Sequence, residues 1–391
     1  MTSNTPLPVL AALAQLWLEI SPAEQSQAWQ QSQRYSTSSS RWNAYLNQIC
    51  LSAVLPWIGE ECGSQAAPWP APAALPSFWE VISGSAIAVD RTRFVLIPTE
   101  TIDLSELRVP QEWVDIPEWA ADYYLAVQII PDEGLVRVWG YTTHQQLKAS
   151  GSYDPGDRTY CLDEDNVIQD LSILWVARQL CPEEPTRGVL PSLPTLPLAQ
   201  AESLLQRLGN PSVVTPRLAV PFELWAALLA HGGWRQRLYE QRQGLLEQWT
   251  ILQWLRAGVS GVAQQIGWSR VDFQPSLVGA RGSEQTSATS ALSRQLVIAG
   301  QSYELRVFPQ GNPKEKIWRF ELQSSSLDAP IPGGFKLRLL TEDLQAFENN
   351  EDVATTPVER LYILVALEPG DSLVWETEPI PENYDREILR F

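Results

Sequence analysis

The chain is poor in the residues that most often carry out chemistry. Only two histidines, His144 and His231, occur among its 391 residues. Histidine is the usual proton carrier near neutral pH and the commonest metal ligand. The four cysteines form no CxxC pattern and no zinc template with those histidines. We therefore expect no catalytic residue, no metal site and no cofactor.

Positive charge is also scarce, since 28 lysines and arginines face 46 acidic residues, a net charge of −18. Such a balance repels nucleic-acid phosphates and anionic membrane surfaces. No apolar run approaches the roughly 18 to 20 residues of a membrane span, and the first residues lack the basic start of a secretory signal. The sequence thus predicts a cytoplasmic protein that binds neither nucleic acid nor membrane.

Tryptophan, by contrast, is abundant, with 17 copies spread from Trp17 to Trp375. Each indole brings a large apolar area and an N–H that needs a partner. Their spread favours several cores or contact faces over one reaction centre. Trp42, Trp139, Trp318 and Trp375 fall within helix or strand patterns and are expected in separate cores.

The first half of the chain predicts a helical N-terminal region over 1–65 and a β-rich middle domain over 77–181. Leu10, Leu13, Trp17 and Ile20 recur at helical spacing, and the Ala/Pro stretch 66–76 is expected to be extended. In the middle domain, strands at 123–130 and 135–141 flank a turn at 131–134, which indicates a hairpin. Both strands are apolar on both sides, so their sheet should be covered twice.

The second half begins with a proline-rich linker over 182–197 and a helical connector over 198–277. One long helix is expected from Trp234 to about Arg256, with an apolar stripe along it. Residues 291–391 contain short alternating strands divided by turn residues, typical of an antiparallel β-sandwich. The predicted fold is therefore α+β and multidomain.

Two motifs suggest chemistry that we weigh against simpler explanations. The segment 262–273 has the spacing of a DNA-binding helix-turn-helix, but Pro275 would end its second helix. A helix end packed on a neighbouring domain is the preferred interpretation. Asp163, Glu164 and Asp165 lack the pattern of a calcium loop and are expected to precede and cap a helix.

Several segments resemble an uncharacterised cyanobacterial domain-of-unknown-function family, and the similarity extends over most of the chain. They are VPQEWVD (109–115), WAADYY (119–124), VWGYTTHQQLK (138–148), LWVAR (174–178) and PGGFKLRL (332–339). The resemblance implies a cyanobacterial, cytosolic protein and supplies no activity.

The leading hypothesis is a non-enzymatic interaction or regulatory protein with a protein partner. Trp113 and Trp119, in a proline-flanked loop, and Trp234 and Trp249, on the connector helix, are the candidate contacts because interfaces favour tryptophan. The alternative is a carbohydrate- or small-ligand-binding protein that uses exposed aromatic residues on the β-sandwich. A third hypothesis, a hydrolase, would use paired carboxylates among Glu376, Glu378 and Glu382.

Overall fold

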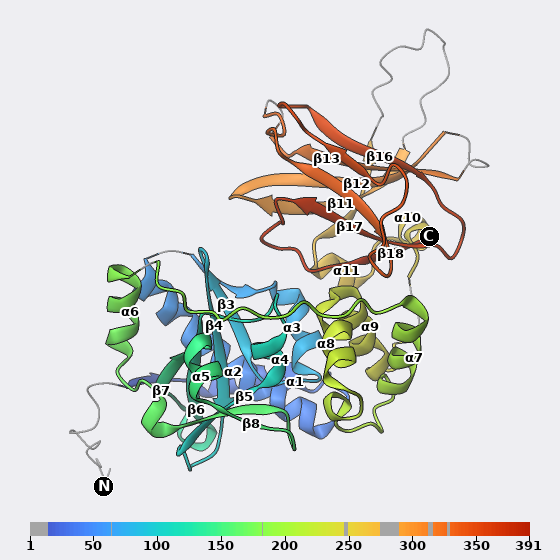
Figure 1. Cartoon of the computed structure of the whole chain (residues 1–391). Helices are drawn as coiled ribbons and strands as arrows, with labels where there is room; N and C mark the ends of the chain where they lie inside the picture. Colours follow the sequence, from blue (N-terminus) through green and yellow to red (C-terminus); the bar gives the residue numbers. More distant parts are fainter. Residues whose placement is uncertain are drawn as a thin grey trace. The chain divides into compact units, whose positions relative to one another are not determined.

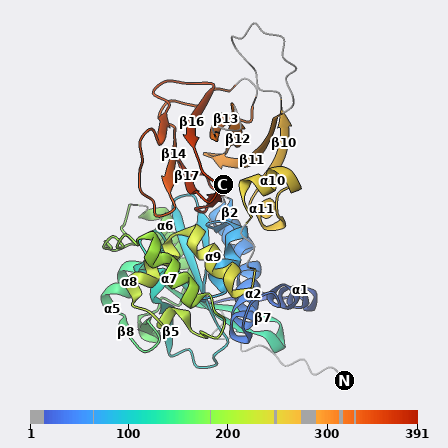
Figure 2. The ribbon, with the colours of Figure 1, turned by 90° about the vertical axis from the view of Figure 1, so that its right-hand side faces the viewer.

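The computed structural model describes residues 15–391 except 64, 182, 246–248, 274–288, 312–315 and 327–328. The chain divides into two compact units (Figures 1 and 2). The N-terminal unit comprises Met1–Leu196 and Gln200–Gly244, and the C-terminal unit comprises Pro197–Ala199 and Leu245–Phe391. Both mix helices with strands, which confirms the predicted α+β class.

A six-stranded sheet forms the centre of the N-terminal unit, in the order β1-β7-β6-β4-β3-β2. Only the central pair β4/β6 is parallel. The strands are β1 (Leu16–Glu19), β2 (Ala66–Trp69), β3 (Ser85–Val89), β4 (Thr92–Thr99), β6 (Tyr123–Ile130) and β7 (Leu135–Thr143). The first seven residues of β6 are buried, as expected for a sheet covered on both faces. The predicted hairpin joins β6 to β7, and Gly134 supplies its left-handed residue at φ 66°.

Two predictions for the start of the chain are wrong. Trp17 lies in edge strand β1 rather than in a helix, because Leu16–Glu19 pair with Leu135–Val138 of β7. Leu10 and Leu13 lie outside the described residues. The segment 66–76 is no simple extended connector, since it supplies edge strand β2 and then turns into short helices. Pairing with distant strands decided both conformations.

Helices surround this sheet, and a small second sheet lies beside it (Figure 1). The small sheet has the order β5-β9-β8, from Glu106–Pro110, Thr159–Asp163 and Ser152–Asp154. The helices are α1 (Pro22–Ser32), α2 (Ser38–Cys62), α3 (Leu75–Trp79), α4 (Gln111–Asp115), α5 (His144–Ser150), α6 (Leu171–Leu180), α7 (Leu198–Leu208), α8 (Phe222–Ala230) and α9 (Gly232–Arg242). Short 3-10 turns cover Pro72–Ala74, Pro131–Glu133, Glu164–Asn166 and Pro216–Leu218.

Two buried ion pairs join the later helices to the earlier part of the unit. Arg242 of α9 donates through Nε to Glu80, 2.9 Å away, and both side chains are at most 1% exposed. Arg217 donates to Glu112, which also accepts from the Trp225 indole at 2.8 Å. The predicted helical connector is therefore divided, and its part from Gln200 to Gly244 belongs to the same unit as the N-terminal helices and the β-rich middle.

The long helix predicted from Trp234 to Arg256 is absent. Helix α9 ends at Arg242, and Gly244 follows at φ 72°, a conformation that ends helices and favours glycine. A new helix, α10, runs from Ile251 to Ala257 with Thr250 as its cap. The apolar spacing that suggested one helix therefore spans two, in different units.

Two antiparallel sheets share one apolar core in the C-terminal unit, which fits the predicted sandwich. One has the order β10-β11-β12-β13-β16, from Trp268–Phe273, Thr289–Ile298, Gln301–Gln310, Ile317–Ser324 and Arg360–Ala366. The other has the order β15-β14-β17-β18, from Glu351–Val353, Lys336–Thr341, Ser372–Glu378 and Ile388–Arg390. Helices α10 and α11 (Gly261–Gln265) precede them. Since Trp268 begins a strand, the segment 262–273 is no helix-turn-helix.

Candidate functional site

Two of the four predicted contact tryptophans lie in the interior. Trp113 and Trp119 are 1% and 2% exposed and pack with Phe78, whose ring centre lies 5.6 Å and 4.5 Å from theirs. The Trp113 indole donates to the carbonyl of Ser83 at 2.8 Å. The prediction of a contact loop is therefore wrong for both residues, because their segment folds inward as α4 and the turn after it.

The other two predicted contact residues differ in their exposure. Trp234 is 3% exposed and stacks on His231 with 4.2 Å between ring centres, so it is a core residue and not a contact. Trp249 is 40% exposed and lies in the chain just before α10, rather than in a helix as predicted. Of the four tryptophans, Trp249 alone stays a candidate contact.

Both histidines hold backbone in place. His231 caps α9, since its Nδ1 accepts from the backbone N–H of Trp234 at 3.2 Å. His144 is fully buried; its Nε2 lies 2.9 Å from the carbonyl of Val114, and its Nδ1 accepts from the N–H of Gly188 at 3.0 Å. This pair of contacts requires the neutral ring with hydrogen on Nε2, and burial lowers the pKa of His144.

Residues 183–196 of the proline-rich segment are fastened to the N-terminal unit at that point. Thr186 and Arg187 both donate to the carboxylate of Asp122, at 2.6 Å and 2.9 Å. Burial alone would raise the pKa of Asp122, but these hydrogen bonds and that from the Arg93 backbone hold it below its ordinary value. Leu196, at the far end, is buried. The segment is thus attached to the unit at residues 186–188 and at Leu196.

Acidification is expected to weaken this attachment through His144. Because its pKa is lower in the folded chain than the ordinary 6.5, the neutral ring contributes stability above about pH 6.5 that is lost as the pH falls through the folded pKa. Urea unfolding at several pH values should show this loss in the wild type and a smaller one in His144→Gln. An identical pH dependence in the two proteins would contradict the assignment.

Two of the three carboxylates considered for hydrolysis are held by different basic side chains, and the third, Glu382, accepts from the backbone N–H of Gly300 at 2.9 Å. Glu376 accepts from Arg386 at 2.9 Å, and Glu378 accepts from Arg338 at 2.7 Å. A hydrogen bond from Lys336 lowers the pKa of Glu378, the opposite of what a general acid requires. Burial raises the pKa of a different acid, Glu387, which bonds the Trp268 indole and Arg294. Each of these acids has a structural partner.

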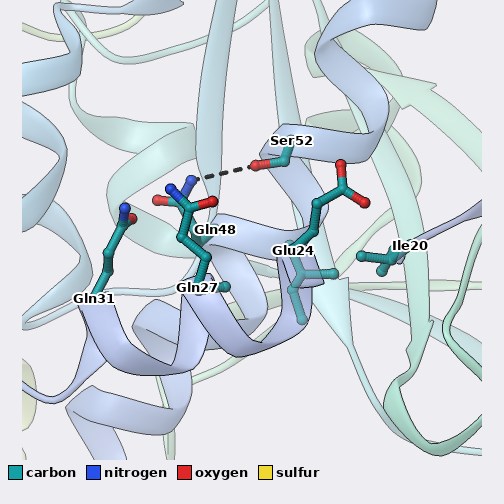
Figure 3. A pocket seen from close by; sticks show the side chains of 8 residues that line it. Ile20, Glu24, Gln27, Gln31, Gln48 and Ser52 are labelled. Carbon is teal, nitrogen blue, oxygen red and sulfur yellow. Dashed lines mark hydrogen bonds between the residues drawn. The ribbon is translucent and has the colours of Figure 1, made fainter. Parts of the chain in front are cut away.

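A small depression of about 180 Å³ lies between α1 and α2 (Figure 3). Its polar rim includes Gln48, which donates to Ser52 at 3.2 Å. Glu24, its one carboxylate, caps α1, and hydrogen bonds from Ser21 keep its pKa below the ordinary value. The lining residues are Ile20, Glu24, Gln27, Ala28, Gln31, Gln48, Ile49 and Ser52. With no second titratable group beside Glu24, this lining has no acid–base pair.

Helix α6 presents three exposed apolar side chains. Ile173, Val176 and Leu180 are 49%, 51% and 75% exposed, and we call these three residues the α6 stripe. Their spacings of three and four place them on one face. Figure 1 shows α6 at the edge of the N-terminal unit, away from α7, α8 and α9. The stripe is suited to receiving another apolar surface.

The opposite face of α6 holds the helix firmly on the sheet. Leu174 is fully buried, and Trp175 packs against Trp57 at 5.3 Å and Phe94 at 5.9 Å between ring centres. Arg178 lies over the Phe94 ring and donates to the Cys62 sulfur at 2.9 Å. Asp170 caps the helix start by accepting from the Ser172 N–H. The stripe therefore lies on a rigid support, and it is apolar where a surface helix is normally polar.

Sequence reasoning predicted this helix but missed its stripe. The pattern LSILWVARQL places apolar residues on both faces of α6, which a search for one buried face does not reveal. The sequence signal for an exposed stripe was that apolar residues occur on two faces of this helix, which lies at the edge of its unit.

Comparison with known proteins places the chain in a family. Residues 18–390 match the family described as "Protein of unknown function (DUF1822)". The chain belongs to this family. The resemblance noted from the sequence is thus confirmed at the level of an uncharacterised domain family. No curated protein and no solved structure matches the chain.

The DUF1822 match extends over most of each compact unit and includes the whole of α6. The family segment therefore contains the α6 stripe and the elements that support it. Within the part of the chain that the structure describes, no helix has both the length and the apolar character needed to cross a membrane.

Proposed function

We propose that this DUF1822 chain is a non-enzymatic interaction or regulatory protein of the cytoplasm that binds a protein partner through the α6 stripe. The observation that carries the proposal is the exposure of Ile173, Val176 and Leu180 on one rigid helix. Complete burial of such a side chain is worth about 1.5–3 kcal/mol. A partner that covers the stripe would therefore gain a large part of this burial free energy for each of the three residues.

The geometry favours a helical partner. Apolar side chains at positions i, i+3 and i+7 of a helix are the usual anchors in helix-mediated recognition. Since the inner face of α6 is fixed by Leu174, Trp175 and Arg178, binding requires little reordering of the helix itself. Preformed surfaces of this kind lose less conformational entropy on association.

Site-specific photo-crosslinking tests the proposal. A benzophenone amino acid at position 173, used in lysate of the source organism, should give one adduct of defined mass. The double variant Val176→Gln/Leu180→Gln should reduce its yield at least roughly tenfold, because polar side chains remove the apolar contact. Copurification with the unmodified chain should recover the same partner in stoichiometric amount.

A crosslinker at Ile102, which is 92% exposed and lies outside the stripe, is the matched control and should give no such adduct. Equal adducts at both positions, or repeated recovery of the bare monomer, would refute the proposal. The same assay with Trp249→Ala asks whether this exposed indole adds to the contact.

The ligand-binding alternative would need a row of exposed aromatic residues on a sheet face of the sandwich. Trp268, Trp318 and Trp375 are 2%, 5% and 0% exposed, while Tyr362 of β16 is 46% exposed. The three tryptophans contribute to the core between the sheets. We therefore do not propose carbohydrate binding.

A further inference from the structure

We infer that the partner presents a basic amphipathic helix to the α6 stripe, an inference that rests on the function proposed above. The new observation is the charge beside the stripe. Glu60 and Glu61 lie in the last turn of α2, and Glu183 and Glu184 follow the end of α6. All four side chains are exposed.

The two helix ends lie together. Arg178, in the last turn of α6, donates through Nη1 to the sulfur of Cys62, the final residue of α2, at 2.9 Å. Its guanidinium also lies over the Phe94 ring. Glu60 and Glu61 therefore lie on the turn that meets the end of α6, which Glu183 and Glu184 follow, while Arg178 is directed toward the interior. Thr92 also accepts from Arg178, at 3.3 Å, and the exposed Asp90 and Arg91 next to it add one charge of each sign, so this corner stays acidic.

Acidic side chains at this position oppose the helix dipole. The carboxyl end of a helix carries partial negative charge and favours cations, yet the last turn of α2 has no basic residue. Helix stability therefore does not explain these glutamates. A cation brought by a partner would relieve the repulsion among them and with the two helix ends.

The opposite end of α6 is acidic as well. Asp163, Glu164 and Asp165 are exposed on the turn before the helix, and Asp170 is its cap. A neutral apolar stripe flanked at both ends by carboxylates is complementary to a helix with an apolar face and basic residues beside it.

Two other occupants fit this charge pattern less well. A second copy placed antiparallel about a two-fold axis would bring the acidic end of one α6 against the acidic start of the other, which is repulsive. Residues 1–14 of this chain, MTSNTPLPVLAALA, contain no lysine or arginine to match the glutamates. A basic helix from a different protein remains the best match.

Peptide binding to the full-length protein tests the inference. The probe is a capped leucine–lysine peptide of about 18 residues with leucines at helical spacing, roughly 27 Å long as a helix. Matched peptides carry glutamate in place of lysine, or the same composition in scrambled order. Fluorescence anisotropy should show binding of the first peptide alone, and Val176→Gln/Leu180→Gln should weaken it at least roughly tenfold.

Charge variants separate this inference from the proposed function. Glu60→Gln/Glu61→Gln should weaken peptide binding roughly fivefold at low ionic strength, and the difference should shrink when salt screens the charges. Glu202→Gln/Glu223→Gln removes as much charge from α7 and α8 and should have no effect. Circular dichroism and thermal unfolding confirm that each variant is folded.

The outcomes differ for the two proposals. If the stripe variant abolishes the crosslinked partner while the glutamate variants leave peptide binding unchanged, the function stands and the basic helix is refuted. If the lysine and glutamate peptides bind equally, the charge argument also fails. A dimer in light scattering that Val176→Gln/Leu180→Gln dissociates, or a stripe that becomes available to the peptide only when residues 1–14 are deleted, would overturn the inference in favour of those occupants.

Discussion

Replacement of Arg242 by methionine is expected to destabilise the N-terminal unit by about 3–5 kcal/mol, because it leaves a buried carboxylate without its counter-charge. Glu80 is fully buried and accepts from Arg242 Nε at 2.9 Å and from Gln243 at 2.9 Å. Arg242 also donates to the carbonyls of Leu208 and Val213, which would lose that donor. Urea unfolding measures the loss directly.

Two further variants give this experiment its controls. Arg207→Met removes an exposed guanidinium on α7 that donates to the carbonyl of Ala219, and it should cost less than about 1 kcal/mol. The double variant Glu80→Leu/Arg242→Met removes both charges and should recover part of the stability. If Arg242→Met were no worse than Arg207→Met, the buried pair would not hold α9 in place.

A second large effect is expected in the C-terminal unit from Arg294→Met. Arg294 is 1% exposed, pairs with Glu387 at 3.1 Å and donates to the carbonyl of Asn383 at 2.9 Å. Without it, Glu387 keeps the hydrogen bond from the Trp268 indole but loses the guanidinium of its ion pair. The expected loss at neutral pH is about 3 kcal/mol.

The pH dependence of this variant should identify the cause. Burial raises the pKa of Glu387 in the folded protein, and the loss of Arg294 should raise it further. A raised folded pKa means that the protonated acid favours the fold at low pH and that this contribution is lost as the pH rises through the folded pKa. The variant should therefore be destabilised less at acidic pH than at neutral pH.

Arg294→Met/Glu387→Gln removes the unpaired charge and should recover stability at neutral pH. Arg270→Met, on the exposed surface of β10, is the matched control and should change little. A loss in Arg294→Met that is the same at every pH would point to packing instead of charge.

Local patterns predicted local structure well. The hairpin 131–134 and the sandwich strands followed from turn residues and alternation. Trp139, Trp318 and Trp375, expected in cores from their strand patterns, are 2%, 5% and 0% exposed, whereas Trp42, expected in a core from its helix pattern, is 37% exposed.

What the sequence could not supply depends on contacts between distant residues. The apolar residues in and around β1 recur at helical spacing, but Leu16–Glu19 form a strand because β7 pairs with them. Trp113 and Trp119 lie in a segment that reads as an exposed loop until Phe78, far earlier in the chain, is placed against them. The α6 stripe was hidden for a different reason: apolar composition says that a residue prefers burial, and not whether anything covers it.

The separation of 162 residues between Glu80 and Arg242 also bears on how the protein is made. At 5–20 residues per second a ribosome needs roughly 10–30 s to add that length of chain. During this interval Glu80 cannot form its ion pair with Arg242, and its burial without a counter-charge is unfavourable. Glu112 likewise has no ion pair with Arg217 until that residue has been synthesised. The nascent N-terminal unit is therefore expected to keep Glu112 in water until Arg217 has left the exit tunnel, and Glu80 until α9 has done so.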